Sequence, residues 1–293
     1  MNTVITRIIW AVAYLIFAPL IGGLLDGFDR KISARMQRRV GPPLLQPFYD
    51  VGKLLHKQTI NVVKSQSFLL LSYLLFMMIT GVMFFIGTDI LMCMFVLSTA
   101  AMFLYFAATV TSSPYSTIGA SRELIQMMAY EPAVLLTCVG FYVVRKTFNV
   151  GEIALANDSA IKYLPGVFVA FVFVLTIKMR KSPFDISTSH HANQEVIKGV
   201  TAEMGARNLA YFQITEWYEN VLLMGIIGLF IINSNPISIP IAIVVILLVY
   251  FLEILIDNCS ARMKYSNMLF LAWTVTLIAS GCNIWLLMMI LED

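Results

Sequence analysis

Glu131 is the acidic residue that most clearly interrupts a long apolar run, and it is the first candidate for chemistry in this sequence. It stands in the segment Met127-Met-Ala-Tyr-Glu-Pro-Ala133, and Glu123 precedes it by eight residues. An ionisable group in an apolar span is costly to bury, so it suggests an ion or proton pathway. On an ideal helix the two carboxylates lie about 80° apart around the axis and about 12 Å apart along it. That spacing is too long for direct proton transfer, but it is compatible with a water-bridged path.

A purely structural interpretation of Glu131 competes with this proton-relay role. The carboxylate would then pair with an arginine and hold the bundle together. Pro132 favours the relay, because proline removes one backbone donor and loosens the turn around the Met128 carbonyl, where water could enter.

A second group of acids occupies a long polar segment and the apolar run that follows it. Its members are Asp185, Glu195, Glu203, Glu216 and Glu219. Glu216 and Glu219 are three apart and share a helix face, as do Glu253 and Asp257, which are four apart. Carboxylates this close together in low dielectric cannot all ionise, which is a property that a proton relay needs. The alternative is an acidic rim that balances basic loops.

No metal-ligand set is evident in the sequence. The four cysteines, Cys93, Cys138, Cys259 and Cys282, form no Cys-x-x-Cys pair, and the adjacent His190 and His191 have no third ligand nearby. Three basic residues that follow an apolar run are most simply interpreted as topology anchors: Lys178, Arg180 and Lys181.

The elements that position these residues are predicted to be membrane-spanning helices. The 293 residues are 59% hydrophobic and 13% charged, with a mean hydropathy of +0.81. Soluble proteins carry roughly 45–50% apolar and about 25% charged residues. The composition therefore excludes a soluble enzyme, a disordered tail and a nucleic-acid binder, and it predicts a single all-α polytopic membrane domain over residues 1–293. Apolar runs indicate about eight spans, at 4–25, 67–87, 90–111, 124–144, 164–179, 217–233, 237–256 and 268–290.

The distribution of basic residues predicts the orientation. Sixteen of the twenty Lys and Arg residues fall in four loops on one side of the predicted bundle, so these loops should face the cytoplasm and both termini the outside. Two of the four loops, 26–66 and 178–216, are far longer than the others and rich in apolar residues. We expect them to form short helices that dock a partner on the cytoplasmic face.

Four motifs resemble the membrane subunit that joins the two arms of respiratory complex I. The first runs from Gln37 to Lys57 and contains Arg39-Val-Gly-Pro-Pro-Leu-Leu-Gln-Pro47. The others are Ser113 to Glu131, the Lys181-Ser-Pro-Phe-Asp185 segment, and the pair Glu203 and Glu216, thirteen apart. They occur in the family's order, and the resemblance covers nearly the whole chain.

The departures from complex I indicate a branch of this family. The Gly-Pro element of the first loop is shortened, the segment Ile186 to Glu195 carries one acid only, and Glu123 stands where complex I usually has an uncharged residue. These features resemble the equivalent subunit of energy-converting, membrane-bound NiFe hydrogenases and of formate hydrogenlyase.

The resemblance implies the partners and the site residues. The expected partners are a NiFe hydrogenase large subunit, an iron–sulfur small subunit and antiporter-like membrane subunits, with electrons from ferredoxin or a formate dehydrogenase. No cofactor is expected in this chain, because the NiFe centre and the clusters would lie in partner subunits. The protein would lie in a prokaryotic inner membrane. Loops 26–66 and 178–216 would form the surface on its cytoplasmic face that holds the soluble module. The expected docking residues are Arg38, Arg39, Gly41, Pro42, Gln46, Pro47, Asp50 and Lys53.

Three other functions remain open at this stage. The chain could be the quinone-binding membrane subunit of a complex I-type NADH:quinone oxidoreductase. It could be a self-contained secondary transporter, although that class often shows an internal repeat and the two long loops share no motif. It could also be a passive anchor whose acids merely satisfy one another.

Overall fold

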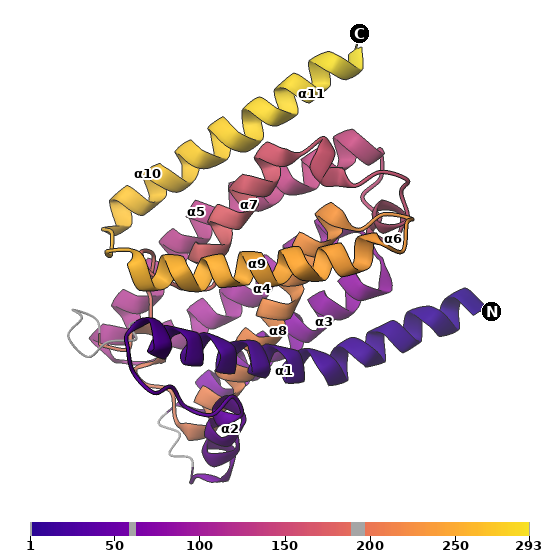
Figure 1. The fold of residues 1–293 in the computed structure, drawn as a ribbon. Helices are drawn as coiled ribbons and strands as arrows, with labels where there is room; N and C mark the ends of the chain where they lie inside the picture. The colour runs from indigo at the N-terminus through magenta and orange to yellow at the C-terminus, as the bar shows by residue number, and fades with distance from the viewer. Residues whose placement is uncertain (1, 59–62, 189–196, 293) are drawn as a thin grey trace.

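The protein folds as a bundle of helices. The computed structural model describes residues 2–58, 63–188 and 197–292 (Figure 1). Seven helical segments in this part of the chain are long and apolar enough to cross a membrane. They are α1 (Asn2–Met36), α3 (Lys64–Ile86), α4 (Ile90–Thr109), α5 (Pro114–Arg145), α8 (Ala206–Ile231), α9 (Ser238–Cys259) and the continuous run of α10 (Tyr265–Val275), the π-helical turn η3 (Thr276–Gly281) and α11 (Cys282–Glu292). The predicted all-α polytopic membrane fold is confirmed.

The remaining predicted span, at 164–179, is an apolar helix that is too short to cross alone. This helix, α7 (Pro165–Lys178), has 14 residues and is therefore about 21 Å long, against a hydrocarbon core of about 30 Å. Asn283 of α11 caps its start, because the Asn283 amide oxygen accepts hydrogen bonds from the backbone N–H groups of Gly166 at 3.0 Å and Val167 at 3.3 Å. α7 thus ends at Lys178, deep within the bundle.

Two helices extend beyond their predicted ends into the long polar segments. α1 continues to Met36 instead of ending near residue 25, and α8 begins at Ala206, eleven residues before the predicted span. Apolar composition does not report these turns, because polar residues can continue a helix when their side chains are paired. Asp26 and Arg30, one turn apart on α1, form such an ion pair at 3.0 Å.

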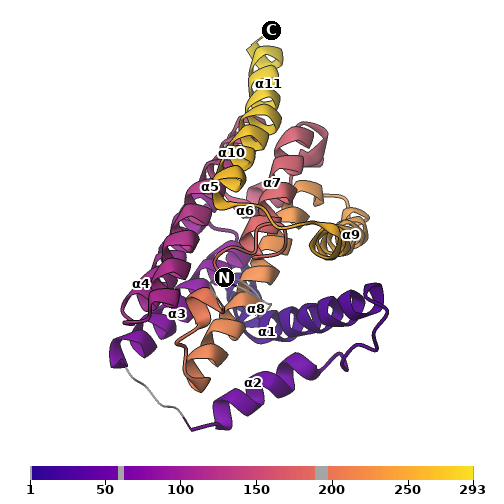
Figure 2. The same cartoon turned by 90° about the vertical axis from the view of Figure 1, so that its left-hand side faces the viewer.

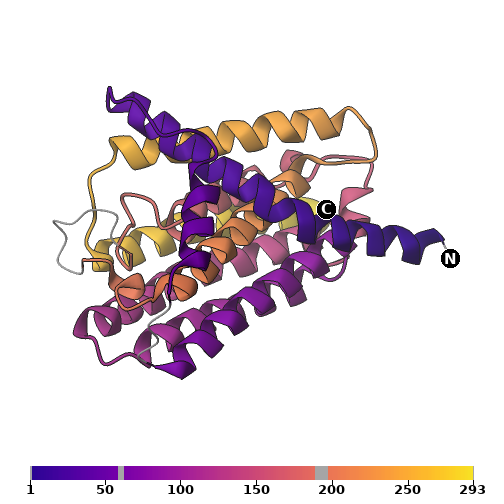
Figure 3. The same ribbon diagram turned by 90° about the horizontal axis from the view of Figure 1, so that it is seen from below.

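A short helix, α2 (Gln46–His56), lies within the first long loop. It runs across the bundle beneath α1 and α8 (Figures 2 and 3). Val51 of α2 is buried with Ala210 and Trp217 of α8. On α1, a Cβ atom at Gly23 would lie 2.5 Å from the Phe48 ring, so glycine permits this close approach. The first loop is therefore packed against the spans rather than projecting from them.

The two ends of the bundle differ in their loops. Figure 1 shows the start of α1 and the end of α11 at one end, together with the short helix α6 (Val150–Ala154). The loops that contain α2 and the short turn η2 (Gly199–Thr201) lie at the opposite end. This arrangement places the two termini on a common side, whereas the side of the membrane that they face stays a prediction.

Candidate functional site

A cavity of about 410 Å³ opens where α1, α8, α9 and the end of α7 meet. Nine of its fifteen lining residues are acids or bases, and we call it the charged cavity. The lining consists of Asp26, Asp29, Arg30, Ser33, Lys178, Met179, Arg180, Lys181, Gln213, Glu216, Trp217, Glu219, Asn220, Tyr250 and Asp257. Such a concentration of charge beside membrane-spanning helices is costly unless the groups are paired or hydrated.

Arg180 holds two of the predicted relay acids together. Its guanidinium contacts Glu123 of α5 through two nitrogens, at 2.7 and 3.3 Å, and Glu216 of α8 through a third, at 3.1 Å. Burial disfavours the charged guanidinium, but the attraction of Glu123 and Glu216 holds the pKa of Arg180 well above its ordinary value. Arg180 is therefore a permanent cation that joins α5 to α8.

Lys178 forms a second buried ion pair. Its ammonium lies 2.8 Å from Glu219 of α8, and both side chains are at most 6% exposed. The Tyr73 hydroxyl of α3 donates to the other oxygen of Glu219 at 3.3 Å. The ammonium also lies 4.4 Å from the centre of the Tyr130 ring, which is a cation–π contact. Three helices thus converge on the end of α7.

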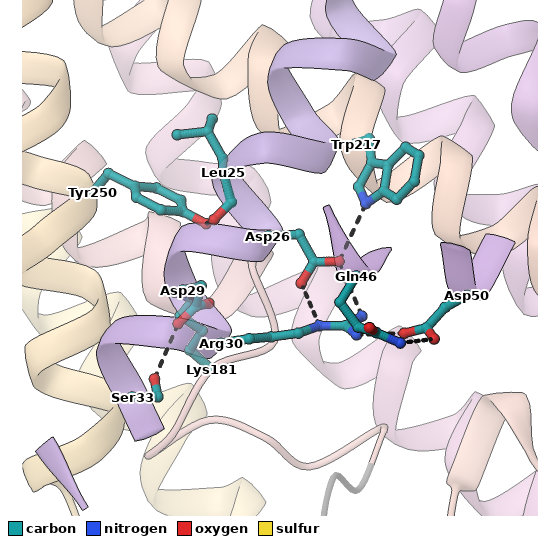
Figure 4. A network of polar contacts seen from close by, with 10 residues as sticks. All are labelled: Leu25, Asp26, Asp29, Arg30, Ser33, Gln46, Asp50, Lys181, Trp217 and Tyr250. Carbon is teal, nitrogen blue, oxygen red and sulfur yellow. Dashed lines mark hydrogen bonds and ion pairs between the residues drawn. The ribbon is translucent and has the colours of Figure 1, made fainter. Parts of the chain in front are cut away.

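A network on α1 connects the charged cavity to α2 (Figure 4). Arg30 pairs with Asp26 through two nitrogens, at 3.0 and 3.1 Å, and with Asp50 of α2 at 2.7 Å. The Gln46 amide donates to Asp50 at 3.0 Å, and the Trp217 indole donates to Asp26 at 3.4 Å. Arg30 is the link between the first long loop and the cavity.

Lys181 carries the network from α1 towards α9. Its ammonium lies 2.8 Å from Asp29 and 5.0 Å from the centre of the Tyr250 ring. Ser33 donates to the other oxygen of Asp29 at 3.2 Å. The backbone N–H of Ser182 donates to Asp257 at 2.8 Å, which holds the end of α9 against the segment that follows α7.

Glu131 lies apart from these pairs, in a smaller pocket of about 100 Å³. We call it the side pocket; its lining consists of Met94, Phe95, Leu97, Ser98, Tyr130, Glu131, Val134, Leu135 and Lys178. Glu131 is partly exposed, and it forms no hydrogen bond or ion pair with another residue that the structure describes. The arginine clamp that the structural interpretation expected for Glu131 is found on Glu123 instead.

Pro132 has a structural consequence beside Glu131. α5 continues through the proline, and the indole N–H of Trp273 on α10 donates to the Met128 carbonyl at 3.1 Å. A neighbouring helix therefore replaces the missing backbone donor, rather than water as the sequence suggested.

The other predicted relay acids are dispersed. Asp185 is buried and pairs with Arg262 at 3.2 Å, outside the charged cavity. Glu203 is exposed, and it lines neither the charged cavity nor the side pocket. Glu195, His190 and His191 lie outside the described residues. Of the seven predicted relay residues, the structure brings together Glu123, Glu216 and Glu219.

The predicted docking residues divide into two groups. Arg38, Arg39 and Lys53 are exposed, and Pro42 is partly exposed. Gln46 and Asp50 face Arg30, Pro47 is buried, and Gly41 packs so closely on α1 that a Cβ atom would lie 3.0 Å from Lys31. The second group positions the loop, whereas the three cations are exposed where a partner could contact them.

Three cations that form buried ion pairs beside the charged cavity have a sequence pattern that we interpreted as that of topology anchors. Lys178, Arg180 and Lys181 are instead buried and paired with acids from other helices. Their position directly after an apolar run could not distinguish the two roles, because paired cations inside a bundle and anchors at its edge have the same local sequence. Asp26 and Asp29 were missed, since they fell outside the predicted first span.

Glu253 is a buried acid of a different kind. It is fully buried on α9, and neither of its carboxylate oxygens has a hydrogen-bond partner among the described residues.

Within residues 2–58, 63–188 and 197–292, no three His, Cys, Asp or Glu side chains are grouped to hold a metal ion.

Comparisons with known proteins agree with this architecture. The sequence profile of the family described as NADH dehydrogenase matches residues 9–288. NADH-ubiquinone oxidoreductase chain 1 of Paracentrotus lividus is 26% identical, over 92% of this chain and 91% of that protein. Hydrogenase-4 component C of Escherichia coli (strain K12) is 24% identical, over 91% of each. A chain of the membrane-bound sulfane sulfur reductase, an archaeal respiratory membrane complex, has the same fold, with a TM-score of 0.85, 21% identity, and coverage of 96% of this chain and 99% of that one.

Proposed function

Because the chain belongs to the NADH dehydrogenase family, we propose that it is the membrane-anchoring and energy-coupling subunit of a membrane-bound NiFe hydrogenase complex. It would link hydrogen chemistry in a soluble module to proton or sodium translocation. Its relatives include subunits of respiratory and hydrogenase complexes, so partner subunits are implied. The similarity to hydrogenase-4 component C along most of the chain, together with the departures from complex I noted above, supports the hydrogenase branch.

The observation that carries this proposal is the connection between α2 and the buried ion pairs. Asp50 of α2 holds Arg30, Arg30 holds Asp26, and Asp26 lines the same cavity as Glu216 and Glu219. A shift of α2 would move Asp50 relative to Arg30. The electric field in the charged cavity would then change. Arg30, Asp26 and Asp50 are about one third exposed, so solvent screens part of this change, whereas buried pairs such as Lys178–Glu219 are screened much less. A redox event in a docked module can therefore reach the membrane interior through a rearrangement of charge.

The proposed partners follow from the same assignment. They are a NiFe large subunit, an iron–sulfur small subunit and antiporter-like membrane subunits, with ferredoxin or a formate dehydrogenase as electron source. The cofactors would belong to these partners. Arg38, Arg39 and Lys53, exposed at the end of the bundle that holds α2, are suited to an acidic surface of the soluble module in the prokaryotic cytoplasm.

Quinone binding, as in a complex I-type NADH:quinone oxidoreductase, is the alternative that family membership also accommodates. Pockets for small organic ligands are lined mainly by apolar and aromatic side chains. The charged cavity has nine acids and bases among fifteen lining residues, a poor match for a quinone with an apolar tail.

The decisive experiment uses the purified, assembled complex in liposomes. We expect hydrogen evolution from reduced ferredoxin without added quinone, accompanied by ion uptake. Electron transfer that requires quinone and is abolished by quinone-site inhibitors would overturn the hydrogenase assignment. Hydrogen evolution without ion movement in liposomes shown to be impermeable to ions would overturn the coupling role.

A further inference from the structure

Lys178 lies at the junction of three separate cavities. It lines the charged cavity and the side pocket of Glu131. It also lines a third cavity of about 10 Å³, close to the smallest that holds one water molecule. The third cavity is bounded by Glu123, Gln126 and Glu219 as well, and the amide oxygen of Gln126 is buried without a hydrogen-bond partner among the described residues. Lys178 is therefore placed between the paired acids and the unpaired one.

We propose that Lys178 transfers protons between the charged cavity and Glu131. This inference rests on the proposed coupling function and adds a carrier to it. Lysine has a compact ammonium on a flexible stem and can release a proton, whereas arginine stays charged in proteins. The two neighbouring cations thus have different roles: Arg180 fixes the charge of its partners, and Lys178 can change its own.

The transfer consists of two balanced proton steps. In the first, the ammonium turns from Glu219 to the side pocket, where an N–H bond of Lys178 breaks and an O–H bond forms on the Glu131 carboxylate. In the second, the neutral amine takes a proton from Glu219, which has been protonated from the charged cavity, and the ammonium–carboxylate pair is restored. One proton has moved from the charged cavity to the side pocket, and no other bond has changed.

The surroundings of Lys178 favour such a movement. Among the described residues, the ammonium has one carboxylate partner, Glu219, whereas the Arg180 guanidinium has two. Tyr130 precedes Glu131 in the chain, and its ring lies under the ammonium, so the ring can stabilise the cation as it leaves Glu219. Ser98 and Glu131 give the side pocket the polar groups that ordered water needs.

The primary test substitutes Lys178→Arg in the assembled complex in liposomes, with ions moved per hydrogen formed as the measurement. A fixed charge keeps the ion pair but cannot release its proton, so we expect hydrogen evolution to persist and proton movement to fall by about 100-fold. Lys162→Arg is the matched control, because Lys162 forms an exposed ion pair with Asp158 at the opposite end of the bundle. Normal coupling in Lys178→Arg would overturn the proposal.

A second measurement needs no folded variant. Dicyclohexylcarbodiimide modifies protonated carboxyl groups in apolar surroundings, and peptide mapping locates the product. We expect more labelling of Glu131 in the wild-type complex during turnover than at rest. Equal labelling in the two states would contradict proton delivery to Glu131. Normal coupling in the Glu131→Gln variant would show that Glu131 is not part of a proton relay. Loss of coupling in Glu131→Gln together with normal coupling in Lys178→Arg would refute only the lysine step.

Discussion

Two glutamates eight residues apart on α5 have opposite surroundings. Glu123 is 3% exposed and bound by two nitrogens on one edge of the Arg180 guanidinium, whereas Glu131 is partly exposed and has no hydrogen bond or ion pair with a described residue. A carboxylate held by a permanent cation is suited to join helices. A carboxylate without such a partner keeps the freedom to gain and lose a proton. An acid in a membrane span can therefore serve structure or proton transfer, and the group paired with it decides which.

The largest effect is expected at the paired end of α5. Arg180→Met leaves Glu123 buried and uncompensated, which should cost about 3–5 kcal/mol of the free energy of unfolding. Denaturation in mixed detergent micelles measures this loss. The double variant Glu123→Gln/Arg180→Met removes both charges, and it should recover about 1 kcal/mol or more. A double variant as unstable as Arg180→Met would show that Glu123 is not the residue that Arg180 stabilises.

The opposite profile is expected at the unpaired end. Glu131→Gln should change the free energy of unfolding by less than about 0.5 kcal/mol, because no hydrogen bond or ion pair with a described residue is lost. Ion movement per hydrogen formed should fall by about 100-fold, as expected when a proton-transferring group is removed. A variant that unfolds easily yet couples normally would reverse the roles assigned to the two glutamates.

The link between α2 and the charged cavity should show an intermediate effect. Arg30→Gln breaks the ion pairs to Asp26 and Asp50, but these groups are about one third exposed, so solvent screening limits the cost to about 1 kcal/mol. We expect the coupling ratio to fall while the soluble module still co-purifies. Arg38→Gln, at an exposed position outside this network, is the control. Loss of the soluble module in Arg30→Gln alone would place Arg30 in docking instead.

The smallest effect on coupling should come from the contact beside Pro132. Trp273→Phe keeps an aromatic ring but removes the N–H donor to the Met128 carbonyl. The free energy of unfolding should fall by about 1 kcal/mol. Water can then reach this carbonyl, so hydrogen exchange of the neighbouring amides should increase, and the coupling ratio should stay unchanged. A large loss of coupling would mean that Trp273 acts on Glu131 and not only on the backbone.

Sequence patterns located the spans but did not identify which charged side chains pair with one another. The run that forms α7 was recognised, since a largely apolar stretch of fourteen residues indicates a helix locally. The pairing of Arg180 with Glu123 and Glu216 was not, because the three residues lie on separate segments of the chain and any of several acids was an equally plausible partner. Glu203 is the reverse case: a motif suggests a relay acid, but the side chain is exposed on a turn away from the charged cavity, so its relay role stays a prediction.

The sequence by itself determined that this is an all-α membrane protein of the complex I-related kind, because hydrophobic length and motif order are properties of contiguous residues. Only the tertiary structure decided that Arg180 binds Glu123, that no described residue binds Glu131, and that Lys178 lies between these two acids. The physical reason is that the energy of a charge in a medium of low dielectric depends on the few ångströms around it, and those neighbours come from helices far apart in the chain.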